Sequence, residues 1–97
     1  MSARLFCRSG ALAGAEYSIE REATIGTATG NTIQLSPPVI SGRHVRIFFD
    51  EKNGRYMLEE FGSSNGTKVD GIPVRGQTPL DALAVITFAN DHDFIFR

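Results

Sequence analysis

Two short segments of this chain concentrate side chains that can bind an oxyanion. One is Ser41-Gly42-Arg43-His44, and the other is Phe61-Gly62-Ser63-Ser64-Asn65-Gly66-Thr67, about twenty positions later. Ser and Asn tolerate tight turns and can direct hydroxyl or amide groups outward, while glycine permits positive φ and close approach of another backbone. Hydroxyl, amide and guanidinium donors at a surface favour an oxyanion carried by another chain.

The bulk properties of the chain limit its function class. The 97 residues are 41% hydrophobic and 22% charged, with a formal net charge of −1. A chain of this length buries roughly 60 to 65% of its unfolded surface, so we expect one domain over residues 1–97 and no separate catalytic domain. A sequence-independent nucleic-acid binder would carry a basic excess on one face, so nucleic acid is not an expected partner.

The cysteine content and the hydropathy pattern indicate the cellular compartment. Cys7 is the single cysteine, which excludes an internal disulfide and favours a reducing, cytoplasmic location. No secretory signal and no apolar run long enough for a membrane span is present, so no membrane contact is expected within this chain. Without such a signal, the glycosylation pattern Asn65-Gly66-Thr67 is interpreted as coincidence. Nothing in the sequence indicates an oligomeric state or a cofactor.

Short β-branched and aromatic runs, separated by Gly, Asn, Asp, Ser and Pro, are typical of an all-β sandwich or barrel. The segment Ala82 to Ile86 could be helical by pattern alone, but we expect a turn that leads into a strand. The final strand ends at Arg97, which favours a module of a longer protein. Strands are expected at Ala3 to Arg8, Glu16 to Ile19, Ala23 to Gly26, Thr32 to Leu35, His44 to Asp50, Arg55 to Phe61, Thr67 to Val69, Ile72 to Val74, Gln77 to Leu80, Ala84 to Ala89 and Asp93 to Arg97.

The best hairpin candidate joins the strands around residues 44–50 and 55–61. Its turn contains Asn53-Gly54, which supplies the positive φ that such a turn needs. Side chains of the first strand alternate with a period of two, which predicts one buried face and one wetter face. The buried set is Val45, Ile47 and Phe49, and the wetter set is His44, Arg46 and Phe48.

Catalytic and metal-binding alternatives have little support. Ser41 and His44 lie three positions apart around a turn, without a nucleophile-elbow pattern, so no hydrolase and no enzyme is predicted. His44 and His92 belong to distant segments, so no metal site is expected. Asp91-His92-Asp93 is interpreted as the polar turn before the last strand.

Four ordered pieces of the sequence together resemble the forkhead-associated (FHA) domain family. Individually each piece is common, but their order and spacing over nearly the whole chain are specific. They are Ile25-Gly26, Asn31 to Leu35, Val39 to His44, and Phe61 to Thr67 followed by Val69-Asp70-Gly71. The resemblance implies a sandwich of two antiparallel sheets with about eleven strands. It also implies that loops at one end bind a phosphothreonine-containing protein or peptide.

The resemblance also implies roles for individual residues. Ser41 and Ser64 would donate hydroxyl hydrogen bonds to the phosphate, Arg43 would add positive charge, and Asn65 would bond the peptide backbone. Gly26, His44, Gly66 and Thr67 would support the site, with His44 bracing the loop from behind. The alternative for Ser41 and Ser64 is that each hydroxyl caps its own turn, as serine in loops usually does.

The sequence departs from the family pattern in three places. Thr27 stands where the phosphate-binding Arg is expected, Gly42 where a polar side chain often reaches the ligand, and Leu83-Ala84 where a Gly-Asp turn is common. Hydrogen bonds to charged groups contribute about 1.5 to 3 kcal/mol, so the neutral Thr27 hydroxyl predicts roughly tenfold to hundredfold weaker binding. The resemblance therefore predicts a weakened phosphothreonine-binding module for signalling or assembly. The alternative is an FHA-like scaffold that binds its partner independently of phosphate.

Overall fold

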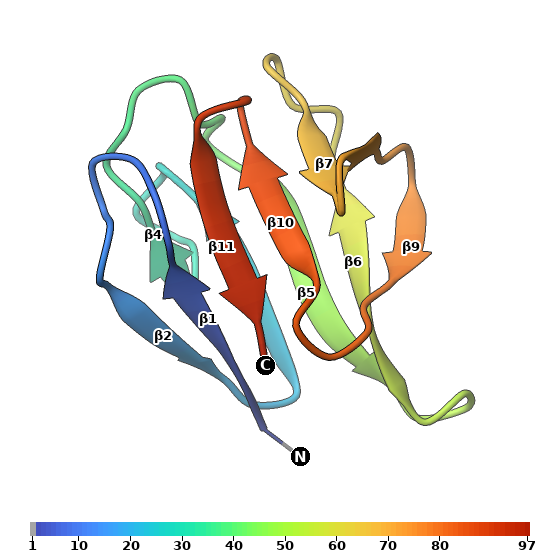
Figure 1. Cartoon of the computed structure of the whole chain (residues 1–97). Coiled ribbons are helices and arrows are strands. Elements are labelled where there is room, and N and C mark those ends of the chain that lie inside the picture. Colours follow the sequence, from blue (N-terminus) through green and yellow to red (C-terminus); the bar gives the residue numbers. More distant parts are fainter. Residues whose placement is uncertain (1) are drawn as a thin grey trace.

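The computed structural model describes residues 2–97, which form two β-sheets packed face to face (Figure 1). One sheet has the strand order β2-β1-β11-β10-β7-β8, and the other has the order β4-β3-β5-β6-β9. The strands are β1 (Ala3–Cys7), β2 (Glu16–Ile19), β3 (Glu22–Gly26), β4 (Ile33–Gln34), β5 (Val45–Asp50), β6 (Arg55–Glu60), β7 (Thr67–Val69), β8 (Ile72–Pro73), β9 (Gln77–Pro79), β10 (Val85–Phe88) and β11 (His92–Phe96).

The predicted all-β sandwich is confirmed, and every expected strand is present with ends that differ by at most one residue. The segment around Ala82 is a turn that leads into β10, as expected, and Leu83 adopts a φ of 65° within it. Alternating apolar and polar residues therefore identify these strands well, because each strand has one face on a single shared core.

One strand pair departs from the expected antiparallel arrangement. β4 runs parallel to β3, with Ile25 opposite Ile33 and Gly26 opposite Gln34. Two reciprocal hydrogen bonds hold the connecting loop alongside β3. Thr24 N–H donates to the Thr32 hydroxyl at 3.2 Å, and Thr32 N–H donates to the Thr24 hydroxyl at 3.1 Å. The chain thus re-enters the sheet in the direction that β3 follows.

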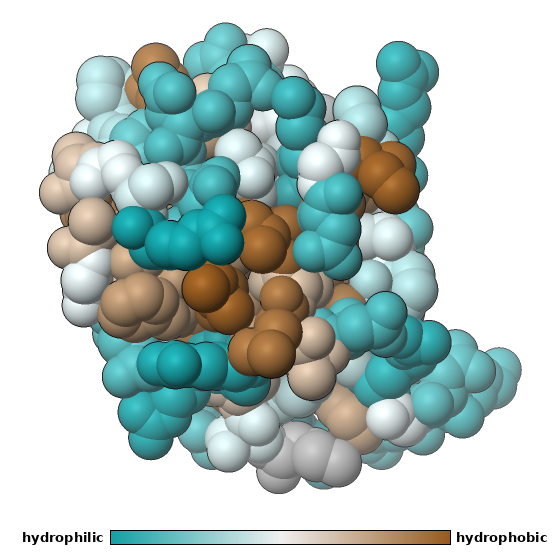
Figure 2. All heavy atoms as spheres, in the orientation of Figure 1, coloured by the Kyte–Doolittle hydropathy of each residue, from teal (hydrophilic) through white to brown (hydrophobic). Residues whose placement is uncertain are grey.

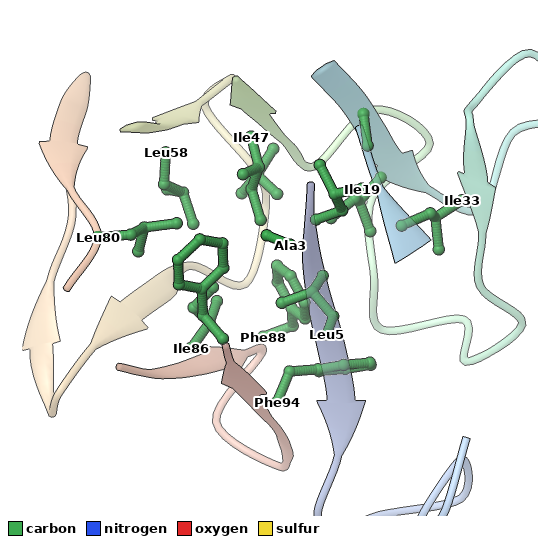
Figure 3. Close-up of a cluster of buried hydrophobic side chains, with 14 of the residues drawn as sticks. Ala3, Leu5, Ile19, Ile33, Ile47, Leu58, Leu80, Ile86, Phe88 and Phe94 are labelled. Atoms are coloured by element: carbon green, nitrogen blue, oxygen red, sulfur yellow. The ribbon is translucent and has the colours of Figure 1, made fainter. Parts of the chain in front are cut away.

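Side chains from both sheets meet in one hydrophobic core (Figure 3). Ile47 and Leu58 of the β5–β6 hairpin are fully buried against residues such as Phe88 and Phe94 of the opposite sheet. The alternation wrongly predicted His44 on the wetter face of this strand: its side chain is fully buried. β5 begins only at Val45, and the turn before it directs the imidazole between the sheets, where it packs edge-on against Phe88 at 5.2 Å between centroids.

The outer face of the six-stranded sheet is partly apolar. Phe6, Val85 and Ile95 alternate with core residues and pair across neighbouring strands, which leaves each of them half-buried. Figure 2 shows hydrophobic side chains gathered on this face over β10 and β11. Cys7 points the other way and is fully buried. No helix within residues 2–97 is long and apolar enough to span a membrane.

The β4–β5 and β6–β7 loops lie at the same end of the sandwich, at the top of Figure 1. β1 begins and β11 ends at the opposite end. The sandwich therefore brings the two donor-rich segments of the sequence to one end.

Candidate functional site

The β4–β5 and β6–β7 loops are joined by direct hydrogen bonds. The backbone N–H of Ser64 donates to Oγ of Ser41 at 3.0 Å, and Nδ2 of Asn65 donates to the carbonyl of Val39 at 2.7 Å. Residues separated by more than twenty positions in the sequence therefore form one continuous polar surface. Ser41, Ser64 and Asn65, which the sequence pattern indicated together, lie side by side.

Both serine hydroxyls keep a proton that no other group within residues 2–97 accepts. Oγ of Ser41 accepts the bond from Ser64, which leaves its own O–H as a donor. Ser64 is exposed, and its hydroxyl makes no hydrogen bond in the described part of the chain. Neither hydroxyl caps its own turn. The hydroxyl that does so is that of Ser63, which accepts from Gly66 N–H at 3.1 Å.

His44 ties the two loops together from below. The backbone N–H of Ser41 donates to its Nδ1 at 3.1 Å, and its Nε2 lies 2.9 Å from the carbonyl of Gly66. A carbonyl only accepts, so Nε2 carries the proton and Nδ1 is the acceptor. The bonds thus require the neutral imidazole. Burial lowers the pKa of His44, although the bond to Gly66 and the charge of Glu60 partly oppose this shift.

Glu60 organises the β6–β7 loop, a role that the sequence did not predict. Its buried carboxylate accepts hydrogen bonds from the N–H groups of Gly62 and Ser63 at 2.5 and 2.8 Å, and from the hydroxyls of Ser63 and Thr67 at 2.5 and 2.7 Å. Burial alone raises the pKa of Glu60, but these donors outweigh it and hold the pKa below its usual value. A glutamate at the end of a strand ordinarily indicates a solvated charge, so sequence offers no signal for this role.

Gly26 allows β3 to approach the β4–β5 loop closely. A Cβ at residue 26 would lie 2.2 Å from the carbonyl oxygen of Gly42 and 2.8 Å from that of Ser41. The same two carbonyls accept hydrogen bonds from Thr27 N–H and Ala28 N–H, both at 3.1 Å. By contrast, a Cβ at Gly42 would meet only Cβ of Ala28, at an ordinary 3.7 Å.

Asn31 also fixes this loop, although its place in the family pattern had carried no individual role. Its Nδ2 donates to the carbonyl of Gly42 at 2.6 Å and to that of Ala28 at 2.9 Å. The carbonyl of Gly42 is therefore held from both sides, and the backbone of the β4–β5 loop has a defined position.

The side chains of Thr27 and Arg43 contact neighbouring residues of the chain rather than Ser41 or Ser64. The Thr27 hydroxyl lies 3.4 Å from the carbonyl of Ile40, to which it donates. Arg43 is exposed, and its guanidinium lies over the Phe61 ring, 4.5 Å from the centroid. A stacked guanidinium keeps its donors free, so Arg43 supplies an unpaired cation from the β4–β5 loop, two positions after Ser41. Residues 2–97 contain no cluster of His, Cys, Asp or Glu suited to a metal ion.

Comparisons with a family model and with solved structures indicate the same family. A sequence model of the FHA domain matches residues 23–89. Comparison with curated protein sequences gives no significant match. A solved FHA domain, described for phosphothreonine-dependent interactions, is 26% identical with a TM-score of 0.84, over 100% of this chain and 96% of that one.

Two further solved structures are similar over 99% of this chain. The FHA domain of an Arabidopsis thaliana hypothetical protein is 26% identical, with a TM-score of 0.88 and 84% of that chain covered. Mycobacterium tuberculosis EmbR, in complex with a low-affinity phosphopeptide, is 25% identical with a TM-score of 0.84, and 24% of that chain is covered.

Gly26, at the end of β3, and Gly42, in the β4–β5 loop, predict mutational effects of very different size. Gly26→Ala forces the β4–β5 loop away from β3, and we expect it to lower the free energy of unfolding by about 1–3 kcal/mol and to shift the loop amides. Gly42→Ala is the matched control, with an expected change of less than about 0.5 kcal/mol. Urea denaturation and amide NMR spectra measure both effects. Equal behaviour of the two variants would contradict the close contact at Gly26.

The neutral state of His44 predicts a pH dependence of stability. Its folded pKa is lowered, so the unfolded chain binds the proton more readily, and stability falls as the pH drops below the unfolded pKa near 6.5. The expected slope is at most about 1.4 kcal/mol per pH unit. The lowered pKa of Glu60 adds a loss in the same direction, but only below the pKa near 4.5 that its carboxyl has in the unfolded chain.

Imidazole ¹⁵N spectra at neutral pH should show Nε2 of His44 protonated and Nδ1 bare, and urea denaturation from pH 7.5 to 5 should follow the predicted slope. In His44→Gln that slope should be smaller. A His44 ring protonated at both nitrogens at pH 7 would disprove the assignment.

Proposed function

Because this chain belongs to the FHA domain family, we propose that it is an interaction module that binds a phosphothreonine-containing protein or peptide. The observation that carries the proposal is the junction of the two loops, where Ser64 N–H donates to Oγ of Ser41 and neither serine hydroxyl has an acceptor within residues 2–97. A phosphate group brings nearly two negative charges and three strong acceptor oxygens, and it is bound best by several converging donors.

In this proposal Ser41 and Ser64 each donate one hydrogen bond to the phosphate. Asn65 uses Oδ1 and its second amide proton for the ligand backbone, because its other donor already holds the carbonyl of Val39. Arg43 supplies positive charge from the edge of the site, where its guanidinium has no carboxylate partner within residues 2–97. His44, Glu60, Gly26, Gly66 and Thr67 keep the loops in position without touching the ligand.

The proposed affinity is lower than that of a site with the family arginine. The Thr27 hydroxyl donates to Ile40, so binding a phosphate would require it to exchange one neutral hydrogen bond for another. Gly42 offers no side chain to the ligand. Among the similar structures, one FHA domain is described for phosphothreonine-dependent interactions, and EmbR is in complex with a phosphopeptide described as low affinity.

We further propose that the module serves signalling or assembly in the cytoplasm and catalyses no reaction itself. A second candidate function is a scaffold that binds its partner independently of phosphate. Two contacts favour it. The Thr27 hydroxyl donates to the carbonyl of Ile40, and Nδ2 of Asn65 donates to that of Val39, so neither of these donor protons is available to a ligand.

Matched phosphorylated and unphosphorylated threonine peptides from a library distinguish the two functions. We expect the phosphorylated peptides to bind selectively and to shift the amide signals of the β4–β5 and β6–β7 loops in NMR titrations. Ser41→Ala and Ser64→Ala should each weaken binding by about tenfold, the loss of one hydrogen bond to a charged group. If an unphosphorylated partner binds while no phosphopeptide does at low salt, the scaffold function is correct.

Thr27→Arg should strengthen phosphopeptide binding by roughly tenfold to hundredfold, because a guanidinium replaces a neutral hydroxyl with charge-assisted bonds. The gain should disappear for the unphosphorylated peptide and should shrink at high salt. Thr27→Gln is the neutral control of similar reach. An equal gain from both variants would mean that charge at this position is not what the site lacks.

A further inference from the structure

A groove adjoins the candidate site, and no residue of the β4–β5 loop lines it. It has a volume of about 500 Å³ and lies between the β6–β7 loop and the turn that joins β8 to β9. Ser64 and Asn65 form one wall, and Pro73, Val74 and Arg75 form the other. A ligand bound at the two serines can therefore continue into this groove without leaving the surface.

Arg75 is distinguished from most other arginines by its lack of a partner. Among the arginines of residues 2–97, six form ion pairs with carboxylates: Arg4, Arg8, Arg21, Arg46, Arg55 and Arg97. Arg43 and Arg75 form none, and both are exposed. Of these two unpaired guanidiniums, that of Arg43 lies over Phe61, while Arg75 lines the groove together with Ser64 and Asn65.

The turn that carries Arg75 is fixed to the base of the β6–β7 loop. Val74 N–H donates to the carbonyl of Thr67 at 2.9 Å, and Glu60 N–H donates to the carbonyl of Gly76 at 2.8 Å. These bonds flank residue 75 on both sides. The guanidinium is therefore presented from a backbone whose position is set by the same strands that hold the candidate site.

The charge of Glu60 does not neutralise Arg75. Glu60 also lines the groove, but its side chain is 6% exposed and forms no ion pair with Arg75. Its oxygens already accept bonds from Gly62, Ser63 and Thr67. Because the Glu60 carboxylate is buried and bonded by these donors, Arg75 is the accessible charged group of the groove. Its guanidinium is suited to bind an anionic side chain.

We propose that Arg75 is a specificity-determining residue that binds an acidic side chain near the phosphothreonine of the ligand. This proposal rests on the proposed phosphothreonine binding and adds the chemistry of the flanking sequence. The anionic group is a carboxylate or a second phosphate, since a guanidinium binds either. Because Arg75 is exposed, the expected preference is small, about two- to fivefold in affinity.

A scan of one phosphothreonine peptide tests the proposal, with Asp, Asn or phosphoserine placed in turn at each nearby position. Wild-type protein should prefer Asp over Asn at one or two neighbouring positions, more strongly at low salt. Phosphoserine should exceed Asp there if the natural group is a second phosphate. Arg75→Glu should reverse the Asp preference and Arg75→Ala should abolish it, while Lys52→Glu, on the distant β5–β6 hairpin, should leave it unchanged.

Two results would overturn the proposal in different ways. If phosphothreonine peptides bind but show no acidic preference, or keep that preference in Arg75→Glu, the role of Arg75 is wrong and the proposed function stands. If no phosphothreonine peptide binds in any arm of the scan, both proposals fail together.

Discussion

The candidate site depends on one buried and uncharged imidazole. His44 accepts a bond from Ser41 N–H and donates to the carbonyl of Gly66, so a single rigid ring sets the spacing between two loops. Packing against Phe88 holds the ring between the sheets. Because a buried polar group must keep its partners, any displacement of either loop would leave Nδ1 or Nε2 unsatisfied. The positions of the two loops are therefore coupled to each other and to the core through His44.

Glu60 and Gly26 complete this arrangement by different means. Glu60 collects donors that would otherwise be unpaired in the β6–β7 loop, and Gly26 lets two backbones lie closer than any side chain would permit. The internal groups are thus satisfied by one another, while the hydroxyl protons of Ser41 and Ser64 have no acceptor within residues 2–97. An anion would meet groups that are already oriented, which lowers the entropy lost on binding.

Local patterns predicted the strands closely, because alternation and turn residues report directly on a two-layer core. The meeting of the two donor-rich loops was expected only from the family resemblance, since local pattern does not place loops together. The parallel β3–β4 pair, the buried position of His44 and the roles of Glu60 and Asn31 were not predicted. Each depends on partners distant in the sequence, and a lone Glu or Asn near a turn ordinarily indicates solvation.

The frame of the candidate site and the positions proposed to face the ligand are occupied by different residues. Gly42 has room for a side chain, since a Cβ there would lie 3.7 Å from Ala28, and Thr27 gives only a long bond to Ile40, whereas Gly26 tolerates no addition. Substitutions at residues 27 and 42 can therefore accumulate under selection while the fold stays constant. For the proposed site, the charge at residue 27 can therefore change by a single substitution that leaves the contacts of Gly26 and His44 intact.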